Sequence, residues 1–389
     1  MVFYRSLLPP VCLLVSSAIS NAQPHFKEQV IDTTISIGYG IALADVDGDG
    51  KTDILLADKK QFVWYRNGDW KKFLMAENLT EHDNVCIAAR DIDGDGRAEV
   101  AVGAQWNPGE TGDDQQSGAV FYLIRPKDPT SLWKPVTLHH EPTVHRMQWV
   151  KSATGKFYLV VAPLHGRGNK NGEGTGSKVL AYQFADNPEG KWTIDTLEGD
   201  MHLTHNFRTI EKTRGYDIYL AGKEGIVLLH EDGTKIRQTP LLLPGMKRGA
   251  GELVTGRTAD YKNFIAAIEP MHGNELTVYI NDFSERILLD STLKEGHAIA
   301  AADFLKKGAD QLVAGWRVPD KQGNVGIKFF MPKDKSGTTW ESFWVDQNGM
   351  ACEDLKALDL DGDGRPDIVA SGRATHNLKI YWNRSGNEK

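Results

Sequence analysis

The sequence has little cysteine. Three cysteines occur in 389 residues, and only Cys86 and Cys352 lie beyond the first 22 residues. Two cysteines cannot build a disulfide framework, and each of these lies in an apolar run typical of a strand. We therefore expect buried free thiols, and the stability of the chain must come from other features.

The sequence also lacks an excess of basic charge and, after its first residues, any run of about 18 apolar residues that could span a membrane. The formal net charge of −7 gives no support to a nucleic-acid partner. Residues 1–22 combine Arg5, an apolar stretch and small residues that end at Ala22. This pattern predicts a signal peptide cleaved after Ala22, and hence a secreted or periplasmic protein.

Three familiar catalytic motifs are missing as well. The chain contains no Gly-x-Ser-x-Gly elbow, no P-loop and no Gly-x-Gly-x-x-Gly dinucleotide fingerprint. Serine-nucleophile, phosphoryl-transfer and hydride-transfer chemistry are therefore not favoured.

What the sequence does contain is one acidic loop in three copies, at residues 45–53, 91–99 and 359–367. Each reads Asp-x-Asp-Gly-Asp-Gly-x-x-(Asp/Glu), so carboxylates recur at positions 1, 3, 5 and 9, and glycines allow a tight turn. An EF-hand would need a glutamate at position 12, where this chain has apolar residues. We expect up to three structural calcium sites, with these ligands: Asp45, Asp47, Asp49, Asp53, Asp91, Asp93, Asp95, Glu99, Asp359, Asp361, Asp363 and Asp367.

Short apolar strands flank each acidic loop, and a unit of about 45–60 residues with several strands recurs seven times. This period predicts an all-β, seven-bladed β-propeller over residues 24–389, without a second domain. The run that begins at Phe26 has no blade of its own, while the last unit lacks an outer strand. We expect the first strand to complete the last blade and so close the ring.

Every acidic loop follows an inner strand, so all of these loops lie on one face of the propeller. The starts of the inner strands and the ends of the second strands then surround the axis on the opposite face, which we call the mouth. Most of the twelve histidines occur at these positions. The candidate site residues at the mouth are His145, Arg146, His205, Glu269, His272 and His297, with His82, Trp106, His165, Arg317, Arg373 and His376 as candidate substrate-binding residues.

Such a mouth can support proton abstraction next to a carbonyl group. A histidine can act as the base, and an arginine can stabilise the developing enolate oxygen. A divalent metal in the mouth is a further possibility. No His-x-His or His-x-x-x-His pair lies on one element, so a metal would need histidines from several blades.

The acidic repeats resemble the FG-GAP/VCBS repeats of integrin-α-type propellers. Residues 143–147, 204–206, 266–274 and 296–298 also resemble the propeller of aldos-2-ulose dehydratases. This second resemblance implies elimination of water from a ketosugar such as 1,5-anhydrofructose, with His145 as the base. Arg146, His205, Glu269, His272 and His297 would then surround the substrate. The fungal enzyme continues into cupin domains associated with a later isomerisation, and we expect any such second step to be absent here or supplied by another protein.

Two other functions stay open. A polysaccharide lyase would use the same β-elimination on a uronate-containing glycan, and a non-catalytic propeller would bind a carbohydrate or a protein. We expect a small ketosugar or glycan as the ligand, no nucleic-acid partner, no membrane span and a monomer.

Overall fold

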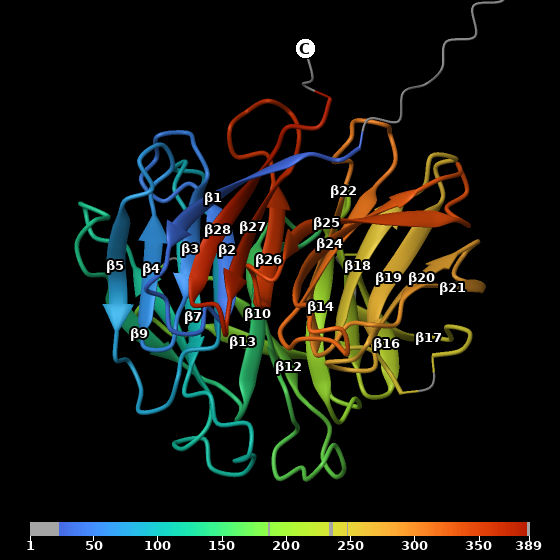
Figure 1. Ribbon diagram of the computed structural model, residues 1–389. Coiled ribbons are helices and arrows are strands. Elements are labelled where there is room, and N and C mark those ends of the chain that lie inside the picture. Colours follow the sequence, from blue (N-terminus) through green and yellow to red (C-terminus); the bar gives the residue numbers. More distant parts are fainter. Residues whose placement is uncertain (1–22, 186, 233–235, 247, 387–389) are drawn as a thin grey trace, which may run out of the picture.

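The computed structural model describes residues 23–389 except 186, 233–235, 247 and 387–389. The predicted signal peptide lies outside the described residues. In the described part, 28 β-strands form seven four-stranded antiparallel sheets, and no helix is present that could cross a membrane. The sheets are the blades of a seven-bladed β-propeller (Figure 1), as the sequence predicts.

The first six blades follow the chain, each from its inner to its outer strand. Blades 1 to 3 contain β2 (Gly40–Ala44), β3 (Asp53–Ala57), β4 (Gln61–Tyr65) and β5 (Lys72–Glu77); β6 (Cys86–Arg90), β7 (Glu99–Ala104), β8 (Ala119–Ile124) and β9 (Lys134–Leu138); and β10 (Val144–Lys151), β11 (Phe157–Pro163), β12 (Val179–Gln183) and β13 (Thr193–Glu198). Blades 4 to 6 contain β14 (Thr204–Glu211), β15 (Tyr216–Gly222), β16 (Gly225–Glu231) and β17 (Ile236–Leu241); β18 (Glu252–Arg257), β19 (Asn263–Glu269), β20 (Glu275–Ile280) and β21 (Glu285–Asp290); and β22 (Gly296–Ala302), β23 (Gln311–Trp316), β24 (Gly326–Pro332) and β25 (Trp340–Gln347).

Blade 7 combines the two ends of the chain. It contains β26 (Cys352–Leu358), β27 (Asp367–Gly372), β28 (Asn377–Asn383) and, as its outer strand, β1 (Phe26–Asp32). Figure 1 shows β1 in blue beside β28 in red, and the two strands pair antiparallel from Phe26↔Asn383 onwards. Because β1 comes from the opposite end of the chain, its pairing ties the last blade to the first.

The inner strands are the closest-packed part of the ring. Each contacts the inner strands of both neighbouring blades. Small residues permit this approach: a Cβ on Gly40 would lie 3.4 Å from the Cα of Cys86 in the next blade. Large side chains such as Trp64 and Trp316 instead fill the wider spaces between blades, where they are fully buried.

Candidate active site

Four inner strands carry a β-bulge at the same point, one residue after they begin. In β10, β14, β22 and β26, the register with the second strand skips His145, His205, His297 and Glu353, respectively. A bulge leaves the extra residue unpaired and re-aims its side chain, and bulges recur near active sites for that reason. The rings then meet across blades: the ring centroids of His145 and His205 lie 4.7 Å apart, and those of His205 and His297 lie 5.3 Å apart.

These bulge residues and their equivalents in the other blades form a ring around the mouth, which we call the axial layer. The strand registers assign its members in blade order: Tyr39, Val85, His145, His205, Gly251, His297 and Glu353. Three of the seven blades therefore place a histidine in this layer directly from the inner strand.

Blade 5 contributes a histidine by another route. Its axial-layer residue is Gly251, and His272 enters the layer from the turn between β19 and β20. The His272 ring centroid lies 4.5 Å from that of His205 and 4.9 Å from that of His297. A Cβ on Gly251 would lie 3.0 Å from the Cα of Met271 and 3.1 Å from the backbone nitrogen of His272. The absent side chain at position 251 thus lets the turn carry His272 inwards.

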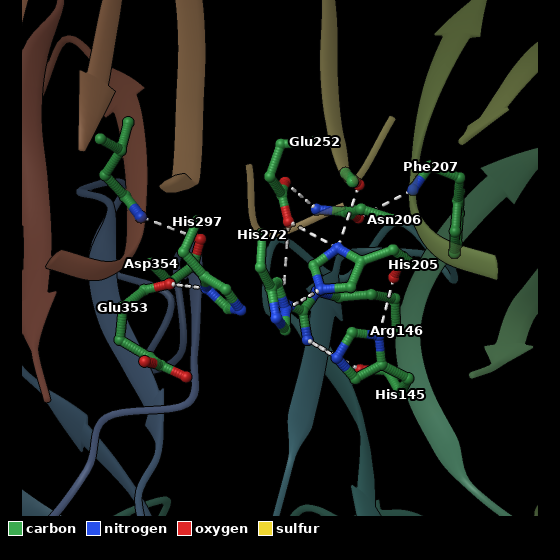
Figure 2. A network of polar contacts seen from close by, with 12 residues as sticks. His145, Arg146, His205, Asn206, Phe207, Glu252, His272, His297, Glu353 and Asp354 are labelled. Carbon is green, nitrogen blue, oxygen red and sulfur yellow. Dashed lines mark hydrogen bonds and ion pairs between the residues drawn. The ribbon is translucent and has the colours of Figure 1, made fainter. Parts of the chain in front are cut away.

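Backbone carbonyl groups fix the tautomers of three imidazoles, as Figure 2 shows. Nδ1 of His145 donates to the carbonyl oxygen of His205 (2.7 Å), that of His205 to Gly251 (3.0 Å), and that of His297 to Glu353 (2.6 Å). Each acceptor belongs to the next blade. Because a carbonyl oxygen can only accept, Nδ1 carries the hydrogen and Nε2 keeps its lone pair.

The four imidazoles are neutral at physiological pH. Burial, reinforced by the charge of neighbouring arginines, lowers the pKa of His145, His205 and His297 well below the ordinary value. Burial and the neighbouring His205 lower the pKa of His272 to about 3. Nε2 of His145, His205 and His297 therefore keeps a lone pair, and that of His205 accepts the Nε2 hydrogen of His272 at 2.6 Å. These lone pairs can take a proton or bind a cation once their present donors are displaced.

A charged group flanks the imidazoles of blades 3 and 4. Nη1 of Arg146 donates to Nε2 of His145 (3.0 Å), and Nη2 of Arg146 lies 3.9 Å from Oε1 of Glu252. Glu252 also accepts from Asn206 and lies 3.1 Å from Nδ1 of His205. Burial raises the pKa of the Glu252 carboxyl to about 7. Arg146 therefore connects the lone pair of His145 to a buried carboxyl group.

The opposite side of the layer carries a second charged group. Glu353 is buried, and its carboxylate receives Nη1 of Arg317 (3.2 Å) and Nη1 of Arg373 (3.3 Å). Arg317 also pairs with Glu295 at 2.9 Å. Both arginines predicted to bind substrate thus border the axial layer, held by a carboxylate that the candidate set lacked.

Among the other predicted substrate-binding residues, Trp106 lies nearest the histidines. Its ring stacks on His145 at a centroid distance of 5.0 Å and an angle of 24°. His82 and His376 are bonded to their surroundings: the His82 backbone nitrogen donates to Gln105, and Nδ1 of His376 donates to the carbonyl oxygen of Ser36. His165 lines a separate cavity between the β7–β8 and β11–β12 loops, and its Nδ1 is buried without a partner.

Glu269, predicted as a catalytic residue, lies apart from the axial layer. Its carboxylate accepts hydrogen bonds from Thr277, Tyr279 and Arg286, the last at 3.1 Å, and none of these residues belongs to the axial layer. Glu269 lies on β19, where alternate side chains point to the faces of the sheet and hence towards neighbouring blades. Its carboxylate therefore belongs to a hydrogen-bond network within blade 5.

Two cavities along the propeller axis border the axial layer. One of about 230 Å³ is lined by Tyr39 and Arg146, and one of about 280 Å³ by Glu252. Both are also lined by Asn206, Asp354 and Lys356. Together they form a polar channel that leads from the axial layer towards the acidic loops.

The three acidic loops have the same local geometry. Ligand atoms at positions 1, 3 and 9 lie within 4.8 Å of one another in each loop, as in Asp45, Asp47 and Asp53. The carboxylate at position 9 is buried, and burial raises the pKa of Asp53 to about 7. In the first loop, Asp49 at position 5 forms an ion pair with Lys51 at 3.2 Å.

Fold and site together define a seven-bladed FG-GAP-repeat propeller with a histidine-lined mouth. Residues 45–102 match the FG-GAP-like repeat, and residues 87–123 match the FG-GAP repeat. Residues 117–282 match the β-propeller domain of aldos-2-ulose dehydratase. That segment includes His145, His205 and His272, whereas His297 follows it.

A curated protein similar in sequence is also named aldos-2-ulose dehydratase. Aldos-2-ulose dehydratase of Phanerodontia chrysosporium is 26% identical over 263 residues, which cover 62% of this chain and 28% of that protein. The matched region is thus less than a third of the relative.

Solved structures agree on the fold alone. A chain of the mitotic checkpoint complex has a TM-score of 0.57 at 12% identity, and the alignment covers 98% of this chain and 98% of that one. BBS1N in complex with ARL6DN, from a mercury-soaked crystal, has a TM-score of 0.56 at 13% identity, covering 93% of this chain and 97% of that one.

Proposed function

We propose that the protein is a sugar dehydratase that removes water from a ketosugar of the 1,5-anhydrofructose type by β-elimination in the propeller mouth. The observation that carries the proposal is the axial layer, in which four neutral imidazoles meet beside arginines. A neutral imidazole can take a proton, and arginines stabilise an enolate oxygen. The name of the 26% identical relative points to the same class of reaction.

Within the layer, we assign the role of base to His145. Its Nδ1 is fixed by the carbonyl oxygen of His205, so Nε2 is the only nitrogen that can accept a proton. Arg146 covers this nitrogen in the free protein and must release it when the substrate enters. The same guanidinium is then available to the substrate oxygen on which negative charge develops.

The other three histidines fit a divalent cation of the zinc class. Ring nitrogens of His205, His272 and His297 lie within 4.8 Å of one another. Two of these rings are held by Nδ1–H donation to a backbone carbonyl group, the support that zinc-bound histidines usually have. A bound cation would polarise the sugar carbonyl group. His145 and Arg146 would then remain for proton transfer and charge stabilisation.

Calcium and location belong to the same proposal. The acidic loops are proposed to bind calcium as structural staples, because their carboxylates at positions 1, 3 and 9 converge. A secreted or periplasmic location, where calcium is abundant, is consistent with this role. The cation would sit on the face opposite the mouth and take no part in the reaction.

The test uses purified protein with 1,5-anhydrofructose, other 2- and 3-ketosugars and uronate polymers, followed by enone absorbance in the ultraviolet. Absorbance that grows with small ketosugars supports the proposal. Absorbance with polymers alone would identify a polysaccharide lyase instead, and no absorbance with any substrate would refute the enzymatic proposal.

His145→Ala should lower kcat by about 10²–10⁴-fold in protein that is still folded. The matched control is His202→Ala, which removes a half-exposed mouth histidine bonded to Glu224. Equal rates for His145→Ala and the wild type would remove His145 from the role of base.

A further inference from the structure

Elimination of water needs an acid as well as a base, because the departing hydroxyl group must be protonated. The imidazoles of the axial layer are poor sources of this proton. Their Nδ1 hydrogens are committed to backbone carbonyl groups in His145, His205 and His297. Nε2 of these three rings accepts a proton and does not supply one, and the Nε2 hydrogen of His272 is committed to Nε2 of His205 at 2.6 Å.

The acidic residues near the layer are also excluded. Glu353 is held between Arg317 and Arg373, so its carboxylate accepts hydrogen bonds only. Glu252 is likewise surrounded by donors, since it accepts from Asn206 and lies 3.1 Å from Nδ1 of His205 and 3.9 Å from Nη2 of Arg146. Arginines cannot serve, because they do not release protons in proteins.

Tyr39 occupies the position in blade 1 that Glu353 occupies in blade 7. Gly40 pairs with Ala57, the last residue of β3, and Asp354 pairs with Ser371, at the equivalent point of β27. Tyr39 precedes Gly40 and Glu353 precedes Asp354, so Tyr39 and Glu353 are equivalent members of the axial layer. In the described part of the chain, Tyr39 is the one member of this layer with a hydroxyl group.

The surroundings of Tyr39 suit a proton donor. The residue is 7% exposed and lines the 230 Å³ cavity together with Arg146, the neighbour of His145. Its hydroxyl group points to Asp83 over a long contact of 3.4 Å, and the Arg373 guanidinium lies 5.4 Å from its ring centroid. Burial raises the pKa of Tyr39 to about 12, so the hydroxyl group keeps its proton at neutral pH.

We propose that Tyr39 is the catalytic acid, which protonates the hydroxyl group that leaves from the carbon β to the sugar carbonyl. The inference rests on the proposed dehydratase function. His145 takes the proton from the α carbon, and the C–H electron pair forms the new C=C bond. The C–O bond breaks, and its electron pair binds the proton from the Tyr39 hydroxyl group to give water. Imidazolium and tyrosinate are left, and both return to their resting forms by proton exchange with solvent.

The experiment compares wild type and Tyr39→Phe on two substrates: the ketosugar itself, and its analogue with fluoride in place of the leaving hydroxyl group. Fluoride departs with little need of a proton. With the ketosugar, kcat should fall by about 10²–10³-fold, with KM changed only a few-fold. With the fluoro analogue, the two proteins should differ by less than about tenfold, because the step that needs the acid is bypassed.

Tyr279→Phe is the matched control. It removes another buried tyrosine hydroxyl group, which donates to the carboxylate of Glu269 and lies away from the axial layer. It should match the wild type on both substrates. An equal loss for Tyr39→Phe on both leaving groups would show that the hydroxyl group is only structural, and no loss on the ketosugar would also overturn the inference. If wild-type protein is inactive on every substrate, the dehydratase function itself fails, which is a distinct outcome.

Discussion

Gly251→Ala is a small change that should disable the mouth. The added Cβ would lie 3.0 Å from the Cα of Met271 and 3.1 Å from the backbone nitrogen of His272. Carbon and nitrogen atoms prefer separations of about 3.5–4.0 Å. Because both obstructing atoms belong to the backbone, neither can rotate away, and the turn that carries His272 must move outwards by several tenths of an ångström.

Two effects follow from this displacement. Overpacking of this kind costs about 1–3 kcal/mol, and a contact short by about half an ångström favours the lower part of that range. The second effect is on the site, since His272 would move away from His205 and His297. Misplacement of a catalytic group by about 1 Å can lower the rate about 10²-fold, so we expect a loss of about 10–100-fold in turnover.

The assay pairs denaturant unfolding with turnover, and Gly199→Ala is the control. A Cβ on Gly199 would meet no atom within 4 Å. Both variants restrict the unfolded chain equally, so their difference isolates the steric term. Wild-type turnover and stability in Gly251→Ala would refute the argument that this glycine admits His272. A loss of stability without a loss of turnover would show that His272 is dispensable.

Three further predictions concern the rest of the propeller. Glu269→Gln should leave turnover unchanged and lower the free energy of unfolding by about 1–3 kcal/mol, because it weakens a buried network with Thr277, Tyr279 and Arg286. A fall in kcat with unchanged stability would instead place Glu269 in the site. Asp32→Asn should cost about 1–2 kcal/mol at pH 7, since hydrogen bonds from Thr34, Tyr65 and Lys72 outweigh burial and hold the pKa of Asp32 at about 2. Its folded-state pKa lies below the unfolded value, so this stability is present above about pH 4 and lost as the pH falls through 2; urea unfolding should therefore show the two proteins converging in acid. Removal of calcium with a chelator should lower the midpoint of thermal unfolding, by the equivalent of about 2.7 kcal/mol if calcium had been present at 100 times its Kd. Asp53→Asn should reduce that effect. An unchanged midpoint would show that the acidic loops are turns that do not bind calcium.

The fold could be predicted because its signal is repeated and local. Each acidic loop marks the junction between an inner strand and a second strand, and the three loops set the phase of the neighbouring units. Position along the strands then places His145, His205 and His297 at the mouth without any knowledge of distant contacts. The histidines could be found in this way because all three occupy the same point of their blades.

Sequence position reveals less where the direction of a side chain depends on a single residue. A position near the end of β19 does not reveal that Glu269 points to the sheet face shared with Thr277 and Tyr279, which puts its carboxylate between strands. Glu252 and Glu353 also start inner strands, but their importance depends on pairing with Arg146 and Arg317, which are distant in sequence. Such pairs become visible only once the ring is closed.

The same reasoning explains why the axial layer is asymmetric although the blades repeat. Seven identical inner strands would place seven identical side chains around the axis, and these could not supply a base, an acid and a charge-stabilising group together. The bulges of blades 3, 4, 6 and 7 each add one residue at the axis, while Gly251 gives its place to His272. Tyr39 enters the layer from a strand whose register has no bulge. Substitutions at these few positions therefore alter the chemistry of the mouth, whereas the acidic loops and the cores between blades keep the ring itself unchanged.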